Sequence, residues 1–233
     1  MAMNRTPPVA VRRQLRQEVG FGCPVPGCGN PYLTWHHFDP PWSVREHHEP
    51  NGMIALCRQH HDQADAGAYT SEQIRRFKEE AILHEREIRG RFEWMRRDLM
   101  VVAGGNFFYR PRYIVNLNGK SFLWCGRDQY NHLLMNLSMP DEHKSPGMVI
   151  QENYWTLEGK PKDVECPPSG KFIKVEYPNG DLFEINFLEM SNYDEIMQRY
   201  SNINVSMWKY SGIQAPMTCA EVKMNVSRGK IAL

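Results

Sequence analysis

Apolar residues recur at a helical spacing before the middle of the chain. The recurring positions, three, four or seven residues apart, are Ile74, Phe77, Ala81, Ile88, Phe92, Met95 and Leu99. Thr70 and Gln73 stand where the two members of a capping box are expected, and Gly104-Gly105 stands where a helix would stop. The pattern predicts one long helix over residues 70–99, within a connecting segment of residues 70–103.

From about residue 106 the period of the apolar residues changes to two. An Asn-Gly pair at residues 118–119 and a Pro-Asn-Gly-Asp run at residues 178–181 each lie between two apolar runs, as in β-hairpins. The expected strands are at residues 113–117, 121–125, 154–157, 172–177 and 182–187, with a short helix at residues 193–200. We therefore predict an α+β protein whose residues 104–233 form a β-rich domain.

The composition is that of an ordinary globular protein, with 41% hydrophobic and 24% charged residues. Lys and Arg number 28 against 27 Asp and Glu, which excludes a generally polycationic coat for nucleic acid but allows a local site. No apolar run approaches the roughly 18 residues that span a bilayer, so we expect no membrane segment and no secretory signal. Cys125, Cys166 and Cys219 are scattered, which is typical of reduced thiols and predicts a cytoplasmic protein.

Four metal-ligand side chains near the N-terminus come as two closely spaced pairs. Cys23 and Cys28 form the first pair, and Cys57 and His60 form the second. Two pairs of thiolate or imidazole ligands, each on a tight turn, are what a tetrahedral zinc site needs. The alternative is buried free cysteines with a surface histidine. The paired spacing favours a structural zinc ion.

Adjacent histidines predict a second centre beside the first. Residues next to each other on a strand point to opposite faces, and neighbours at a helix start diverge by about 100°. One histidine of each pair, His36-His37 and His60-His61, can therefore serve one centre while its neighbour serves another. Asp65 lies four residues after His61, on the same helical face. His36, His61 and Asp65 are the expected ligands of an open site for a divalent metal.

The order of these residues resembles the HNH, or ββα-metal, endonucleases, in the branch that contains zinc. The resemblance rests on His36-His37, the run Asn51-Gly-Met-Ile-Ala-Leu-Cys57, and His60-His61, and it covers about residues 20–78. It implies a two-stranded ribbon that carries the first histidines and a helix that carries the last ones. Residues 1–69 would then form a zinc-stapled nuclease domain.

The resemblance also implies a role for each matching residue. His37 matches the general base that activates water, and Asn51 matches the asparagine that orients this base. His36 and His61 match ligands of the catalytic metal, and His60 takes the place of a zinc cysteine. Asp65 stands where some relatives have a third metal-binding histidine, and a carboxylate is suited to Mg²⁺ or Mn²⁺.

The leading hypothesis is a metal-dependent endonuclease that hydrolyses DNA, in a setting such as bacterial restriction or anti-phage defence by analogy. The β-rich domain would then serve targeting, sensing or assembly, with a ligand or protein as its partner. A non-catalytic zinc module that binds nucleic acid or protein is the second hypothesis, and an RNA nuclease is the third. The surplus histidines His36, His37 and His61, which a zinc module does not need, favour the enzyme.

Several neighbouring side chains have two readings. For His47 and His48 a solvated loop is favoured over a place near the metal, and for Trp35, Phe38 and Trp42 core packing is favoured over stacking on nucleotides. Phosphate contact and a solvated helix face explain the basic group Arg58, Arg75, Arg76 and Lys78 equally well. The aromatics of the second half are expected in the sheet core or as a stacking surface; these are Tyr109, Tyr113, Trp124, Tyr130, Trp155 and Tyr177.

We also expect a homodimer or a larger assembly, because one such site cuts one strand at a time and two symmetric sites cut both. The candidate interface is the apolar stripe of the long helix, in which His84 and Arg91 fill the remaining seam positions. The alternative is that this stripe packs against the chain's own β-rich domain.

Overall fold

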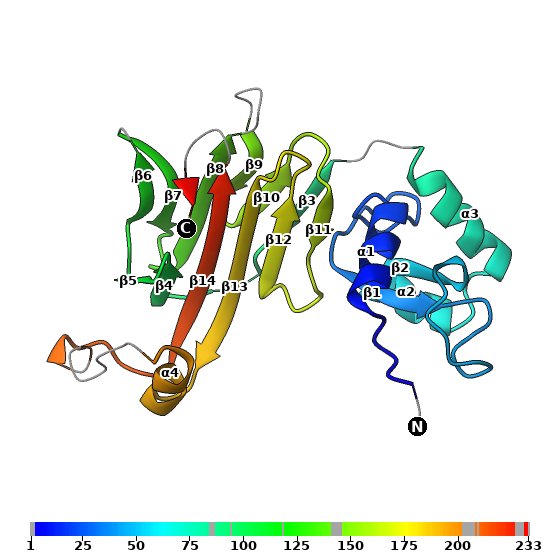
Figure 1. The fold of residues 1–233 in the computed structure, drawn as a ribbon, viewed down its shortest axis with the longest axis horizontal. Helices are drawn as coiled ribbons and strands as arrows, with labels where there is room; N and C mark the ends of the chain where they lie inside the picture. The colour runs from blue at the N-terminus through cyan, green and yellow to red at the C-terminus, as the bar shows by residue number, and fades with distance from the viewer. Residues whose placement is uncertain are drawn as a thin grey trace. The chain divides into compact units, whose positions relative to one another are not determined.

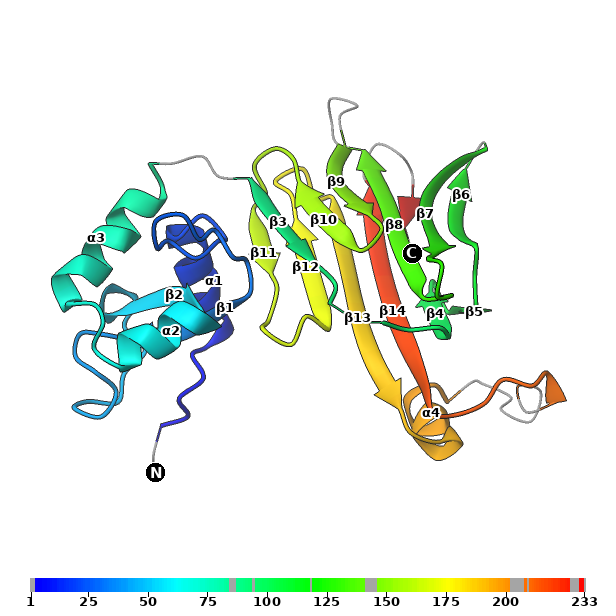
Figure 2. The ribbon, with the colours of Figure 1, turned by 180° about the vertical axis from the view of Figure 1, so that it is seen from behind.

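The computed structural model describes residues 3–83, 87–93, 95–117, 119–140, 146–201, 208, 210–226 and 231–232. The chain is mixed α and β, with few helices and mostly sheet (Figures 1 and 2). It divides into two compact units. Unit 1 comprises Met1–Arg91 and Thr156–Pro178, and unit 2 comprises Phe92–Trp155 and Asn179–Leu233. The predicted α+β class is confirmed at this level.

Unit 1 is built around a two-stranded ribbon and the helix that follows it. In the ribbon, His36 stands opposite Ile54 and His37 opposite Met53. All five residues of the second strand are buried, as expected for a short continuous apolar run. The elements of unit 1 are α1 (Val9–Glu18), β1 (Leu33–His37), the 3-10 turn η1 (Pro50–Gly52), β2 (Met53–Cys57), α2 (Arg58–Asp65), α3 (Ser71–Ala81), β3 (Ile88–Arg91), β11 (Asp163–Glu165) and β12 (Phe172–Glu176).

Helix α3 begins as predicted and ends much earlier. The capping box is present, since Gln73 N donates to Thr70 Oγ1 at 3.2 Å and Thr70 N donates to Gln73 Oε1 at 2.9 Å. The helix ends at Ala81, and strands occupy residues 88–91 and 99–103, so the predicted long helix over residues 70–99 is wrong beyond that point.

The physical reason lies in the spacing. Residues four apart share a face in a helix and also in a strand, so Ile88 and Phe92 fit both periods. Ile82 and Leu83, directly after the helix, are 66% and 76% exposed and have no core to enter. His84 lies outside the described residues.

The apolar stripe of α3 is buried within unit 1. Ile74 and Ala81 belong to the same core cluster as Leu15 of α1 and the whole of β2, and Phe77 packs against that cluster. The apolar stripe that we expected to contact a second copy is therefore already buried within unit 1 along α3. Of the later seam residues, Ile88 and Arg91 lie in β3, and Met95 is 75% exposed and lies outside any helix.

The antiparallel hairpin β11–β12 is tied to α1 by charge. The guanidinium of Arg16 donates to both carboxylate oxygens of Asp163, at 3.0 and 2.7 Å, and Arg16 is only 3% exposed. Arg13 pairs with Asp163 and Glu176. Arg16 and Asp163 are 147 residues apart in the sequence, and a buried, bidentate pair of this kind fixes the two segments to each other.

Unit 2 consists of two ladders of strands. In one, β6, β7, β8 and β9 pair antiparallel in that order. In the other, β13 pairs antiparallel with β14, β14 pairs parallel with β4, and β4 pairs antiparallel with β5. The further elements are β4 (Leu99–Ala103), β5 (Asn106–Tyr109), β6 (Tyr113–Leu117), β7 (Lys120–Arg127), β8 (Leu133–Pro140), β9 (Pro146–Gln151), β10 (Tyr154–Leu157), β13 (Leu182–Met190), α4 (Tyr193–Arg199), β14 (Met217–Val226) and β15 (Ile231–Ala232).

The strands predicted from turn chemistry are confirmed. The pair β6–β7 flanks Gly119, while Asn118 lies outside the described residues. The strands on either side of residues 178–181, the strand at residues 154–157 and the helix at residues 193–199 are also present. Of the aromatic group, Trp155 is fully buried, whereas Tyr113 and Tyr130 are 51% and 64% exposed. No helix in the described part of the chain is long and apolar enough to cross a membrane.

Candidate metal and catalytic site

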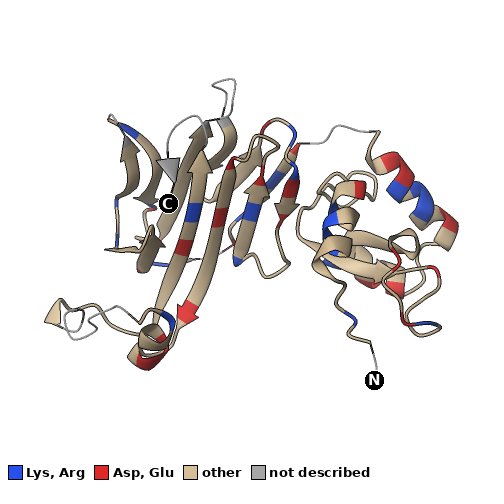
Figure 3. Cartoon of the chain, viewed as in Figure 1, with Lys and Arg blue, Asp and Glu red and all other residues tan. Residues whose placement is uncertain are grey.

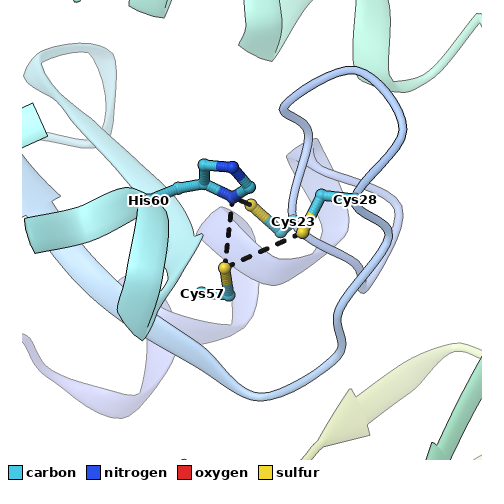
Figure 4. A group of neighbouring side chains, drawn as sticks. All are labelled: Cys23, Cys28, Cys57 and His60. Atoms are coloured by element: carbon cyan, nitrogen blue, oxygen red, sulfur yellow. Dashed lines mark hydrogen bonds between the residues drawn. The ribbon is translucent and has the colours of Figure 1, made fainter. Parts of the chain in front are cut away.

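The first cluster gathers the four side chains of the two ligand pairs (Figure 4). Cys28 Sγ lies 3.8 Å from Cys57 Sγ, and His60 Nδ1 lies 3.3 Å from Cys23 Sγ and 3.2 Å from Cys57 Sγ. Tetrahedral zinc with ordinary bond lengths would place two sulfurs about 3.8 Å apart, and a sulfur and a nitrogen about 3.6 Å apart. The cluster can hold a metal ion, and its donors and spacing are compatible with zinc.

Local backbone structure brings these four donors together. Cys57 ends β2, and His60 lies one turn later in α2, so both point to the same place. Cys28 sits in a tight turn in which Cys28 N donates to Val25 O, and Gly29 N donates to Cys23 O. Gly29 has a φ of +66°, a conformation that favours glycine.

Burial of the cluster makes the thiolate form of its cysteines energetically costly in the absence of a cation. Burial raises the pKa of the Cys23 and Cys28 thiols, and the neighbouring Cys57 sulfur raises both further. The thiols of Cys23 and Cys28 therefore stay protonated in the absence of a cation. Metal binding removes the penalty, because a coordinating thiol is deprotonated by the ion.

The second cluster gathers His36, His61 and Asp65, whose ligand atoms all lie within 4.8 Å of one another. The Nδ1 atoms of His36 and His61 lie 3.1 and 3.4 Å from the Asp65 carboxylate oxygens. His61 Nε2 lies 3.2 Å from the carbonyl oxygen of Trp35. A carbonyl can only accept, so Nε2 carries a proton, and in the neutral tautomer with this bond Nδ1 has the lone pair.

This arrangement fits a metal ligand set. A metal-binding histidine usually donates its other N–H to a carbonyl or carboxylate, as His61 does to Trp35. The Nδ1 atoms of His36 and His61 are buried and form no hydrogen bond of normal geometry within the described residues. Burial lowers the pKa of His36 and outweighs the opposing effect of the Asp65 carboxylate, so the neutral, ligating form is favoured.

Each adjacent pair of histidines is divided between two centres, as the sequence predicted. His60 belongs to the cysteine cluster and His61 to the second cluster. His36 faces His61, with ring centroids 5.2 Å apart, whereas His37 faces Trp42, with centroids 4.7 Å apart. The strand geometry of β1 therefore sets His37 beside the second cluster without making it a ligand.

His37 is surrounded by a group of rings from the loop between β1 and β2. Besides Trp42, His47 lies 5.2 Å and His48 lies 6.0 Å from its ring centroid. Burial lowers the pKa of His37 to about 4. His37 is therefore neutral at pH 7 and able to accept a proton.

The structure overturns the prediction for His47. Asn51 is not among the residues that surround His37. The solvated loop expected for His47 is wrong, since this residue is 4% exposed and packs against His37. Asn51, to which the resemblance gives the orientation of the base, lies in η1 with an exposed side chain. No contact described in the structure joins Asn51 to His37, and its role stays a prediction.

Two residues of the second cluster and His37 border one cavity of about 410 Å³. His36, His37 and Asp65 line it together with Trp42, Tyr69, Ser71 and Arg5. Arg5 was not identified from the sequence. Met3 N donates to Glu46, and His48 Nε2 donates to Asn4 O. The N-terminal segment is therefore held against the loop between β1 and β2, which brings Arg5 to the cavity.

The basic group on the helices pairs within the chain. Arg58 and Arg76 form ion pairs with acidic residues four positions on, and Lys78 pairs with Glu18. Arg75 pairs with Asp39 and lies over the ring of Phe38. Figure 3 shows basic and acidic positions interspersed along α3. The three arginines therefore lie on solvated helix faces with local ion pairs, whereas the side chain of Lys78 is largely buried.

Comparisons of the chain with protein-family models, with curated proteins and with solved structures gave no match. The functional argument therefore rests on the geometry of the two clusters and the cavity.

Proposed function

We propose that the chain is a metal-dependent endonuclease that hydrolyses phosphodiester bonds in DNA. One observation carries the proposal: a three-residue ligand set with two buried, unsatisfied imidazole nitrogens lies directly beside a neutral histidine, and both border one cavity. Structural proteins need neither feature. A nuclease needs both, because it must activate water and relieve charge on the phosphate.

His36, His61 and Asp65 would hold a divalent ion such as Mg²⁺. When bound there, the ion supplies positive charge for the scissile phosphate and for the leaving oxygen. The carbonyl of Trp35 holds the His61 ring in the tautomer that leaves Nδ1 available. The mixed histidine and carboxylate set also suits Mn²⁺ or Ni²⁺, so the assay must compare metals.

His37 would take the proton from the attacking water. Its low pKa keeps the ring neutral at physiological pH, and its place on the opposite face of β1 from His36 keeps it out of the ligand set. Arg5 carries a positive charge into the same cavity, where it would attract a phosphate oxygen. The His37 ring on β1 and the Arg5 guanidinium on the N-terminal segment thus border the same cavity.

We propose that the four-residue cluster holds zinc for a structural purpose. Its four donors leave no open position for a water or substrate, which is the pattern of structural rather than catalytic zinc. The six cysteines are all free of disulfides, in keeping with our proposal of a reducing, cytoplasmic setting.

The decisive experiment incubates purified full-length protein with plasmid DNA, phage DNA that carries modified bases, and RNA. Each substrate is tested with Mg²⁺, Mn²⁺, Ni²⁺ and EDTA, and His37→Ala is the matched catalytic control. We expect DNA cleavage that needs a divalent metal and that His37→Ala reduces roughly 10²–10⁴-fold. Cleavage of RNA but not DNA would show that RNA is the substrate. Nucleic-acid binding without cleavage would favour the hypothesis of a non-catalytic zinc module.

The β-rich part of the chain would target the nuclease or assemble it. We propose a homodimer or larger assembly for double-strand cleavage, since one site acts on one strand. Light scattering during chromatography, with and without DNA, tests this proposal. A monomeric mass in both conditions together with full double-strand cleavage would contradict it.

A further inference from the structure

We propose that His47 positions His37, the proposed base, by closing the loop between β1 and β2. This inference rests on the proposed function, because it gives a role within that site. The loop covers residues 38–52 and contains every ring that faces His37 within the described structure. The contacts that hold this loop in place therefore determine the orientation of the His37 ring.

The two ends of the loop meet at Gly52. Its carbonyl accepts from Phe38 N at 3.0 Å and from Asp39 N at 3.2 Å, and Gly52 N donates to Glu49 O at 3.0 Å. These bonds continue the β1–β2 ladder by one step beyond His37. They fix the backbone at the base of the loop and leave its interior to be held by side chains.

The ring of His47 bridges the interior of the loop. Glu49 N donates to His47 Nδ1 at 3.2 Å, so that nitrogen is an acceptor and the proton sits on Nε2. Nε2 then donates to the carbonyl of Pro40 at 2.9 Å. One buried side chain thus joins two backbone groups nine residues apart, with both of its nitrogens used.

Packing leaves this ring little freedom. It meets the ring of His37 edge to face, at 5.2 Å and 88°. On another side it lies against Gly52, where an added Cβ would fall 2.9 Å from His47 Cε1 and 2.0 Å from Asp39 O. A side chain at position 52 would displace the ring, so this glycine is required by the close approach.

His47 has the properties that an orienting residue needs, and Asn51 lacks them here. His47 is 4% exposed, hydrogen-bonded at both nitrogens and in contact with His37, whereas the side chain of Asn51 is exposed. We assign to His47 the task that the family resemblance gives to Asn51. It acts through His37 and the loop rather than on the substrate.

The test compares substitutions of equal size that differ in hydrogen bonding. His47→Phe keeps the ring and removes both bonds, and His47→Gln keeps a donor and an acceptor. We expect His47→Phe to lower kcat roughly 10²-fold with little change in KM, as a misplaced catalytic group does. His47→Gln should recover a large part of that loss. His132→Phe, the same change at a partly buried histidine of unit 2, should leave kcat unchanged.

A double-mutant cycle separates positioning from general damage. In the His37→Ala background, His47→Phe should have little further effect, because the residue it positions is gone. An equal loss of rate in both backgrounds would overturn the proposal. So would a loss of rate in Asn51→Ala combined with normal activity in His47→Phe.

A spectroscopic readout keeps this inference separate from the proposed function. Imidazole ¹⁵N–¹H spectra of the full chain should show His47 as the Nε2–H tautomer, and His47→Phe should shift the His37 resonances more than those of His132. If the wild-type protein cleaves no substrate, the endonuclease proposal fails while these spectra still decide the positioning. An Nδ1–H tautomer, or unmoved His37 signals in a folded variant, would refute it.

Discussion

Removing one ligand of the cysteine cluster is the sharpest test of its structural role. Cys57 is 2% exposed, ends β2, and lies 3.8 Å from Cys28 Sγ and 3.2 Å from His60 Nδ1. Cys57→Ala leaves three donors and adds no new group. Cys125→Ala is the matched control, because Cys125 is also buried, at 6% exposure, but lies in β7 of unit 2.

The expected magnitude follows from the number of ligands. Structural zinc sites contribute about 10–16 kcal/mol in small peptides, so one ligand in four is about 2.5–4 kcal/mol. At 1.4 kcal/mol per factor of ten, zinc affinity should fall about 10²–10³-fold. With a shift of about 2–4 °C per kcal/mol in a chain of this size, the unfolding midpoint of unit 1 should fall by about 5–16 °C.

The assay measures zinc content after purification without added metal, zinc affinity against a chromogenic chelator, and thermal unfolding. Wild type and Cys125→Ala should each hold about one tightly bound zinc per chain. Cys57→Ala should lose it and unfold earlier. If Cys57→Ala keeps its zinc at unchanged affinity and melts with Cys125→Ala, the cluster is a group of buried thiols and the reasoning fails.

Three further predictions concern other parts of unit 1. Asp163→Asn should destabilise unit 1 by about 3–5 kcal/mol in urea unfolding, because it removes the charge of the carboxylate that binds the buried Arg16 guanidinium through both oxygens; an unchanged midpoint would show that the pair is dispensable. Gly52→Ala should cost about 1–3 kcal/mol through overpacking against Asp39 O and lower the cleavage rate, and full activity would contradict the close approach. Arg5→Ala should weaken DNA binding and reduce the slope of log K against log salt by about 0.9, whereas Arg5→Lys should keep the slope; equal slopes in all three proteins would remove Arg5 from the phosphate site.

Local chemistry explains what the sequence could predict. The Asn-Gly turn and the alternating runs beside it specify hairpins through neighbours in the chain, and the capping box at Thr70 marks a helix start in the same way. The division of adjacent histidines follows from strand and helix geometry alone. These features need no knowledge of distant segments, so the members of both candidate ligand clusters could be predicted from their spacing.

Features that depend on distant partners escaped the sequence. The end of α3 at Ala81 is set by the absence of a core beside Ile82 and Leu83, which periodicity does not reveal. The burial of His47 depends on a loop that closes over it through the carbonyl of Pro40 and the backbone N–H of Glu49. A Glu-His-His-Glu run is polar in composition, so only the folded loop distinguishes its buried His47 from the half-buried His48 and the two exposed glutamates.

The pairing of α1 with β11 has a consequence for how the protein is made. Arg16 leaves the ribosome 147 residues before Asp163, the carboxylate that neutralises it in the folded chain. At about 5–20 residues per second, translation of that interval takes about 7–30 s. Throughout this delay the first helix carries three arginines without their acidic partners, so unit 1 cannot reach its final form until the chain has passed residue 176. Completion of unit 1 is thereby coupled to synthesis of most of the β-rich part.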